Sequence, residues 1–406
     1  MSSCFWASAC QAENSCGARR VDRQRWINLF AAIAAITVFG FALGLMFPLL
    51  SLVMEENGVT PKVIGYNTAM QPLGILVAGF IVPHMTRRFG TKPVAIAAAI
   101  LTASLIVTYP FMPIFWGWFA MRLIQGFAVA ILFSVSEAWV VEAASGPARS
   151  RIMAVYTGVL SLSFGLGPAL ISLTGIDTIL PFFIGAAVLL AGTLPMFFYR
   201  QTEAFAPDSE SSGLSIIGFA RLAPILIVAV GMFAIIDAAN LGLLPIYGVK
   251  KGLSRETAAL MLTAFIAGNI VLQFPIGWIA DHWSKRGMMS ACAIATAIGS
   301  FLVPWAFATW LIWPVLIATG AASAGIYTLA LAELGERFSG HELVAGTAAF
   351  STMWGGAALL GALLGGLAIE RFGPDGLPYA IAAVFLGFIL AIAARTFLRG
   401  RAPTRV

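Results

Sequence analysis

The stretch FPIGWIADHWSKRG, Phe274 to Gly287, is an apolar run that ends in a short group of charged and polar residues, after which apolar residues resume. An earlier stretch, VPHMTRRFGTKP from Val82 to Pro93, has nearly the same pattern. Both place a few basic residues between two long apolar segments, which is typical of a loop that joins two membrane spans. Only the later stretch carries an acid at its start, because Asp281 stands where the earlier one has Arg87.

The composition of the chain supports this interpretation. Hydrophobic residues make up 60% of the sequence, charged residues make up 10%, and the mean hydropathy is +0.91. Soluble domains are roughly 45–50% apolar and about 25% charged. Because a helix needs roughly 20 consecutive apolar residues to cross a bilayer, and the chain supplies many such runs, we predict an all-α integral membrane protein.

We predict twelve membrane spans from the apolar runs and the prolines that divide them. Their approximate limits are 27–54, 63–83, 93–110, 114–141, 152–174, 178–199, 222–247, 257–280, 287–308, 312–334, 343–369 and 377–397.

The longest polar interlude between spans, 200–221, contains RQTEAFAPDSESSG and is typical of a flexible linker. It leaves six spans on each side, and each basic stretch follows the second span of its half. Matched features in two halves indicate an internal duplication with parallel topology. The predicted units are a disordered tail (1–26), an N-terminal six-helix bundle (27–199), the linker, a C-terminal six-helix bundle (222–398) and a short tail (399–406).

The distribution of basic residues predicts the orientation. With both termini in the cytoplasm, 18 of the 24 Lys and Arg fall in cytoplasmic segments and five in outer loops. Such a bias toward the cytoplasmic side is usual for membrane proteins. It accounts for the net charge of +6 without nucleic acid as a partner. We therefore expect a multi-pass protein of the inner membrane with both ends in the cytoplasm.

The later stretch contains a recognisable motif. Gly277-x-x-x-Asp281-x-x-Ser284-Lys285-Arg286 resembles the signature loop of the major facilitator superfamily, although it departs from that pattern at His282 and Ser284. The earlier copy lacks the leading glycine and the acid. The resemblance implies twelve helices arranged as two pseudo-symmetric six-helix bundles.

Two further motifs point the same way. Arg122-x-x-Gln125-Gly126 resembles the family's motif of the fourth span. The Ser-Glu-Ala-Trp sequence that ends at Trp139, and Pro245-x-Tyr247-Gly248, resemble a poorly characterised bacterial branch of sugar or drug transporters. That branch does not imply a particular substrate.

Charges inside a membrane are costly and usually face a cavity or a partner. Asp237 lies about fifteen residues, or ~22 Å, into the seventh span, and Asn240 follows it by one helical turn. A buried carboxylate gains proton affinity, so Asp237 is a candidate for proton coupling or for binding a cationic solute. A structural hydrogen bond is the alternative. Arg122 is a candidate for holding an anionic group of the substrate or for biasing a nearby carboxylate, and snorkelling to the interface is its alternative.

Other polar and aromatic residues within the spans could line a substrate cavity, although the amides could equally form hydrogen bonds between helices. These candidates are Gln125, Asn67, Gln71, Tyr156, Asn269, Gln273, Tyr327 and Trp354.

The resemblance also implies a cytoplasmic gate, because the acid of the family's signature loop resembles a latch against the start of a helix from the other half. A helix N-terminus attracts negative charge. Asp281, in the loop with Lys285 and Arg286, should therefore approach the start of the fifth span, at Arg149 and Arg151.

In the first half the charges would be reversed, with Arg87 or Arg88 facing the acids Glu336 and Glu342 near the start of the eleventh span. Glu137 and Glu333 are expected near the cytoplasmic ends of the fourth and tenth spans, in a gating or capping role.

We predict a secondary active transporter that moves a small solute by alternating access, driven by protons. An uncoupled facilitator is the alternative, followed by a transport-inactive sensor or scaffold. The chain has no Gly-Lys-Ser/Thr phosphate loop, so we expect no ATP-driven transport by this chain. We also expect no enzymatic activity, cofactor or metal, and a monomer as the working unit.

Overall fold

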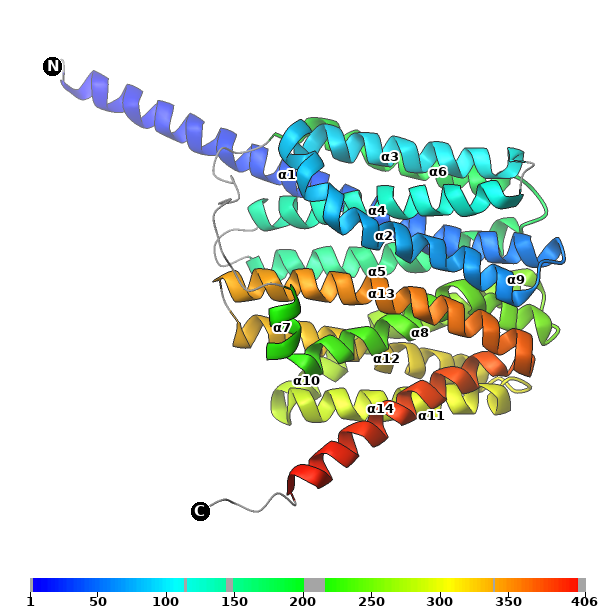
Figure 1. The fold of residues 1–406 in the computed structure, drawn as a ribbon. Helices are drawn as coiled ribbons and strands as arrows, with labels where there is room; N and C mark the ends of the chain where they lie inside the picture. Colours follow the sequence, from blue (N-terminus) through cyan, green and yellow to red (C-terminus); the bar gives the residue numbers. More distant parts are fainter. Residues whose placement is uncertain (1–2, 113–114, 144–148, 201–215, 339, 401–406) are drawn as a thin grey trace.

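The computed structural model describes residues 3–112, 115–143, 149–200, 216–338 and 340–400, and every regular element within these ranges is helical (Figure 1). The elements are α1 (Ser3–Glu56), α2 (Pro61–Phe89), α3 (Thr91–Thr108), η1 (Tyr109–Phe111), α4 (Phe115–Ala143), α5 (Arg149–Thr174), α6 (Leu180–Thr193), η3 (Leu194–Phe198), α7 (Ile216–Leu222), α8 (Pro224–Lys250), α9 (Arg255–Val271), α10 (Gln273–His282), α11 (Lys285–Ala306), α12 (Ile312–Arg337), α13 (Gly340–Phe372) and α14 (Gly376–Gly400).

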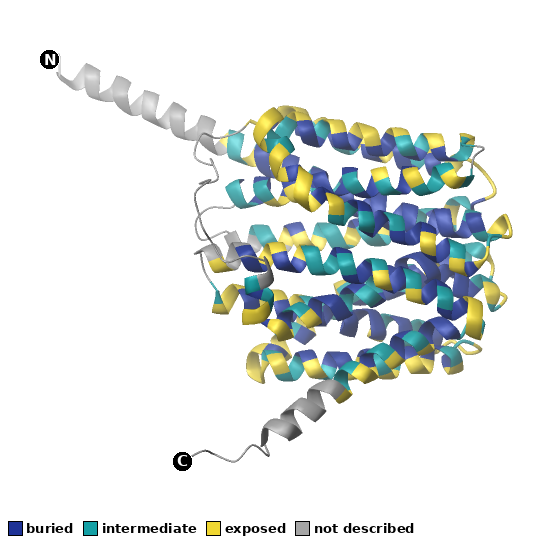
Figure 2. Ribbon diagram, viewed as in Figure 1, coloured by how far each residue is buried: buried dark blue, intermediate teal, exposed yellow. Residues whose placement is uncertain are grey.

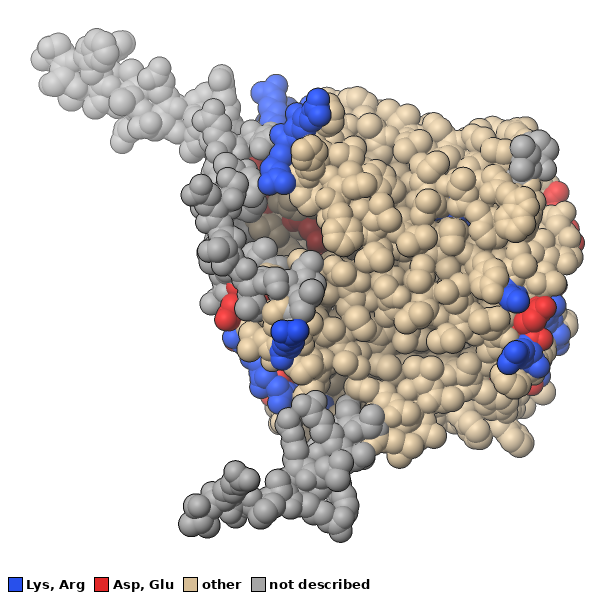
Figure 3. Space-filling model, viewed as in Figure 1, with Lys and Arg blue, Asp and Glu red and all other residues tan. Residues whose placement is uncertain are grey.

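The helices fit the predicted membrane fold. Eleven helical segments of the described chain are long and apolar enough to cross a membrane, and α14, apolar over Gly376–Leu390, takes the place of the twelfth predicted span. Charged side chains gather at the two ends of the bundle, and the face between them is almost free of charge (Figure 3). Large apolar side chains such as Phe80 and Leu173 are 74% and 84% exposed, which suits contact with lipid.

The structure differs from the predicted boundaries in three places. The span expected near 257–280 consists of α9 and α10, which meet at Leu272. The predicted linker 200–221 contains most of α7. Helix α1 begins at Ser3, within the segment for which the sequence predicts a disordered tail.

Both chain ends lie on one side of the bundle, where α1 begins and α14 ends (Figure 1). We call this side the terminal face and the other side, which carries Glu56 and Arg255, the opposite face. Within the described residues, α2 packs against α13 and α5 packs against α9, and these pairs join the two halves. Buried residues concentrate where the helices pack on one another (Figure 2).

Close glycine contacts occur at matched positions in the two halves. A Cβ on Gly74 of α2 would lie 2.1 Å from the Leu123 carbonyl oxygen of α4, and a Cβ on Gly268 of α9 would lie 1.9 Å from that of Ile317 in α12. Gly268 and Ile317 each lie 194 residues after their N-terminal counterparts.

The same shift of 194 residues relates other glycines. It relates Gly126 to Gly320, each of which lies against the partner helix of its crossing, and also Gly167 to Gly361. The two halves are therefore built on one plan, and the shift places Asp281 at the position of Arg87.

Replacing Gly320 with Ala should destabilise the protein, because the new Cβ would lie 1.9 Å from the Phe265 carbonyl oxygen, a backbone atom that cannot move alone. Overpacking of this kind costs about 1–3 kcal/mol. Thermal unfolding of the purified protein measures the effect. Gly277→Ala is the matched control, since nothing lies within 4 Å of its Cβ position; equal unfolding temperatures for the two variants would contradict the close crossing.

Candidate functional site

The two halves meet tightly toward the opposite face. A Cβ on Gly65 of α2 would lie 2.7 Å from the Ala362 carbonyl oxygen and 3.0 Å from the Gly366 Cα, both in α13. A Cβ on Gly242 of α8 would lie 2.5 Å from the Thr68 Cγ2 in α2. These glycines let helices from different halves touch with no side chain between them.

Ion pairs strengthen this closure. The Arg255 Nη1, at the start of α9, lies 3.1 Å from the Glu56 Oε1 at the end of α1 and 3.5 Å from the Asp177 Oδ1 beyond α5. Both acids belong to the other half. The sequence did not indicate this contact, because nothing local distinguishes Arg255 from other loop arginines.

The terminal face has no comparable closure among the described residues. The Lys285 Nζ pairs with Glu336, and the Arg286 Nε and Arg337 Nε lie 2.9 Å and 3.0 Å from the Glu333 Oε1. All of these residues lie in the second half. Figure 3 shows a hollow at this face, with acidic atoms visible inside it.

No ion pair among the described residues corresponds to either predicted latch. Asp281 is exposed and makes no ion pair with a described residue, and the side chains of Arg149 and Arg151 lie outside the described residues. The Arg87 Nε donates to the Pro83 carbonyl oxygen at 3.2 Å, and Arg88 lies over the ring of Phe89.

The acids predicted to pair with Arg87 or Arg88 do not contact them in this structure. Glu336 is paired with Lys285, and Glu342 is exposed. The two latches therefore stay predictions for a state that is closed at the terminal face.

Several predicted residues gather in the part of the bundle toward the terminal face, where α4 ends and α5 begins. Glu137 of α4 is exposed and within electrostatic range of Tyr156 in α5 and Tyr327 in α12, so this group includes both halves. The Ser136 and Tyr156 hydroxyls lie 2.8 Å apart, and the ring of Phe233 stacks on that of Tyr327 at 5.1 Å.

Asp237 is central in α8, 13 residues from Pro224 and 13 from Lys250. Its side chain is partly exposed, and no described residue is hydrogen-bonded to its carboxylate. Asn269 and Trp354 are also partly exposed on α9 and α13, and the Gln273 Nε2 donates to the Ala321 carbonyl oxygen at 3.4 Å.

A second group of predicted residues is fully buried in the first half. The Arg122 Nη1 donates to the Asn67 Oδ1 at 3.2 Å, and the guanidinium lies 5.0 Å from the ring centroid of Phe47. The Tyr109 hydroxyl donates to the Gln125 Oε1 at 3.3 Å. We call Arg122, Asn67, Gln71 and Gln125 the buried polar cluster; each is 0% exposed.

Many polar atoms of the buried polar cluster lack a hydrogen-bond partner. These are the Arg122 Nε and Nη2, the Asn67 Nδ2, both amide atoms of Gln71 and the Gln125 Nε2. Unpaired buried polar atoms are costly and call for an explanation. No ion pair of the described residues includes Arg122.

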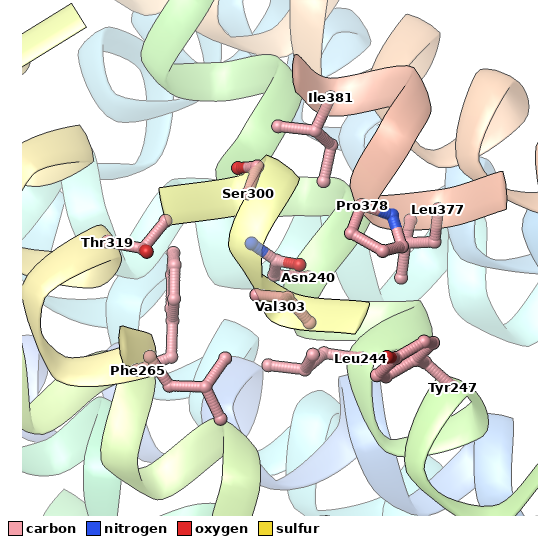
Figure 4. Close-up of a pocket in the computed structure, with 11 residues that line it drawn as sticks. Asn240, Leu244, Tyr247, Phe265, Ser300, Val303, Thr319, Leu377, Pro378 and Ile381 are labelled. Atoms are coloured by element: carbon pink, nitrogen blue, oxygen red, sulfur yellow. The ribbon is translucent and has the colours of Figure 1, made fainter. Parts of the chain in front are cut away.

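Asn240 does not share its surroundings with Asp237. It lines a pocket inside the second half, together with Ser300, Thr319, Phe265 and Tyr247 (Figure 4). Asp237 is not among the residues that line this pocket. Although Asn240 follows Asp237 by one helical turn, the two side chains do not share this pocket.

A sequence model described as Major Facilitator Superfamily matches residues 30–261 and again residues 226–406. A protein of Bacillus subtilis named as an uncharacterized MFS-type transporter, YfkF, is 23% identical over 369 residues, covering 90% of this chain and 94% of that protein. The MFS-type transporter YcaD of Escherichia coli, also named as uncharacterized, is 24% identical over 364 residues, covering 89% and 94%.

Solved structures share the fold. The nucleoside transporter NupG matches with a TM-score of 0.73 at 13% identity, covering 93% of this chain and 100% of that chain. A D-xylose-proton symporter matches with a TM-score of 0.69 at 15% identity, covering 90% and 96%.

Proposed function

This chain belongs to the major facilitator superfamily, and we propose that it is a secondary active transporter that moves a small solute by alternating access, coupled to protons. One observation carries the proposal: the halves are joined across the opposite face, through Gly65 and Arg255, while the ion pairs of the terminal face stay within one half. One closed end and one open end are what alternating access requires of each of its two end states.

The excess of basic residues at the terminal face supports a cytoplasmic location for that face, and hence for both chain ends. The relatives are bacterial, which supports the inner membrane. In this orientation the hollow opens to the cytoplasm, and the conformation is inward-facing.

We assign proton coupling to Asp237. It is a carboxylate near mid-membrane, partly exposed and without a hydrogen-bond partner among the described residues. Such a group can take up and release a proton as water access alternates. The fold shared with a D-xylose-proton symporter is compatible with coupling. The alternative is an uncoupled facilitator in which Asp237 hydrogen-bonds to the solute.

Reconstituted vesicles with an imposed proton gradient test the proposal, with labelled sugars, nucleosides, amino acids and organic acids as trial solutes. At least one solute should accumulate above its external concentration and leave when a protonophore is added. A facilitator would only make the solute concentrations inside and outside the vesicle equal, with or without the gradient. If no solute crosses the membrane, the transporter proposal is wrong and a sensor or scaffold is favoured.

Replacing Arg255 with Gln should shift the conformational equilibrium only modestly. Its ion pairs are about one-third exposed on the arginine side, and such pairs contribute about 0–1 kcal/mol. Alkylation of a cysteine at position 137 (Glu137→Cys, with Cys4, Cys10 and Cys16 changed to Ser) reports the open terminal face. We expect a decrease in its rate of less than about fivefold.

This decrease should vanish in about 1 M salt, where the Debye length is ~3 Å. A change larger than tenfold, or one that persists at high salt, would show that Arg255 acts by more than these exposed ion pairs.

A further inference from the structure

We propose that the buried polar cluster is a binding site for the anionic group of a solute, which makes Arg122 the recognition residue for an organic or inorganic anion. This inference rests on the proposed function, because it names the class of solute.

The shift of 194 residues relates the buried polar cluster to the pocket of the second half. Gln71, Arg122 and Gln125 correspond to Phe265, Leu316 and Thr319, and Tyr109 corresponds to Val303. All four counterparts line the pocket, and Figure 4 shows Phe265, Thr319 and Val303 around it. One place in the fold is thus an internal pocket in the second half and a group of long polar side chains in the first.

The helix crossing itself does not require these polar side chains. Gly268 and Gly320 bring α9 and α12 as close together as Gly74 and Gly126 bring α2 and α4. The second half makes this crossing with Leu316 and Phe265 beside the glycines. A structural role alone therefore does not account for an arginine and two glutamines at the same places in the first half.

The chemistry of the buried polar cluster favours an anion. Arg122 carries a fixed positive charge, has five N–H donors and has no ion-pair partner among the described residues. Among the described residues, only the Asn67 Oδ1 accepts a hydrogen bond from Arg122. Five of the six unpaired atoms in the buried polar cluster are N–H donors, and the sixth is the Gln71 Oε1. Exchanging the amide oxygens and nitrogens would re-pair individual atoms but would not supply a negative charge.

The buried polar cluster lies at the same level of α2 as the contact between the halves. Asn67 is adjacent to Thr68, which packs against Gly242 of the other half, and it lies about 3 Å along the helix axis from Gly65, which packs against α13. Separation of the halves at the opposite face would expose the side of α2 that carries Gly65 and Thr68, whereas Asn67 lies on the side of α2 that faces α4. The complete burial of the buried polar cluster comes from the packing of α2 against α4 within the first half.

Thermal unfolding of the purified full-length protein, titrated with sodium acetate, chloride or phosphate, tests the inference without any gradient. At least one anion should raise the unfolding midpoint of the unmodified protein in a saturable way, by roughly 2–4 °C at high occupancy. Acetamide, the neutral analogue of acetate, should give no shift. Equal shifts with acetate and acetamide, or no shift with any of the three anions, would overturn the anion site.

Arg122→Leu copies the residue of the second half and should remove the stabilisation by anions. Arg371→Gln, which removes an exposed arginine at the end of α13, should retain it and controls for ionic strength and net charge. If Arg122→Leu does not fold, Gln125→Thr, which copies Thr319, serves instead and should weaken anion binding roughly 5- to 10-fold. Anion stabilisation unchanged in the folded variant would overturn the inference.

The vesicle assay separates the two proposals. Anion binding that depends on Arg122, together with no movement of any solute, would leave the site standing and contradict transport. Accumulation of a neutral solute that is equally fast in Arg122→Leu, together with no anion binding, would support transport and overturn the anion site.

Discussion

Asp237→Asn should abolish gradient-driven accumulation of the solute while exchange of solute across the vesicle membrane continues. Asparagine has nearly the shape of aspartate and keeps a hydrogen-bonding side chain, but it cannot release or bind the coupled proton. The halves can still rock around a bound solute, so labelled solute inside should still exchange with unlabelled solute outside. We expect the accumulation ratio to fall to about 1, the equilibrium value of uncoupled transport. Measurement of both rates in the same vesicles tests this.

Asp375→Asn is the matched control. Asp375 is also an acid of the second half, but it lies at the opposite face, where its carboxylate pairs with Lys251 at 3.0 Å. Its replacement should leave the accumulation ratio unchanged. If Asp237→Asn accumulates solute as well as this control, coupling through Asp237 is excluded. If Asp237→Asn loses both exchange and accumulation, Asp237 is instead assigned to solute binding.

The paired bundles and their repeated loops could be predicted from the sequence because the signals are local. Long apolar runs predict spans, and the basic residues that follow Val82 and Ile279 predict loops on one side of the membrane. The correspondence of Arg87 to Asp281 could also be recognised in the sequence. The structure adds glycine contacts in the two halves that are separated by the same 194 residues. A constant shift between close contacts is evidence for duplication that no single loop provides.

The grouping of the polar residues could not be predicted, because it depends on how each helix is rotated and on which half it faces. Asp237 and Asn240 are one turn apart, yet only Asn240 lines the pocket of the second half. Arg122 was identified from its depth, but the gathering of Gln71 and Gln125 beside it follows from a glycine crossing. Arg255 joins the halves through acids far away in the sequence.

Gly65→Leu should trap the protein open at the opposite face and abolish transport. Even a Cβ at this position would lie 2.7 Å from a backbone oxygen of α13, so the leucine fits only when the halves separate there. Overpacking costs about 1–3 kcal/mol, which changes the ratio of the two states by roughly 5- to 150-fold. The alkylation rate of Glu137→Cys should fall by a factor in this range, because closure of the terminal face covers position 137.

Gly79→Leu is the matched control, since it makes the same change in α2 and nothing lies within 4 Å of the Gly79 Cβ position. Its alkylation rate and transport should resemble those of the unmodified protein. A Gly65→Leu protein that transports normally would contradict closure through this glycine. One that loses transport but keeps rapid alkylation at position 137 would show that the leucine blocks movement without favouring the outward-facing state.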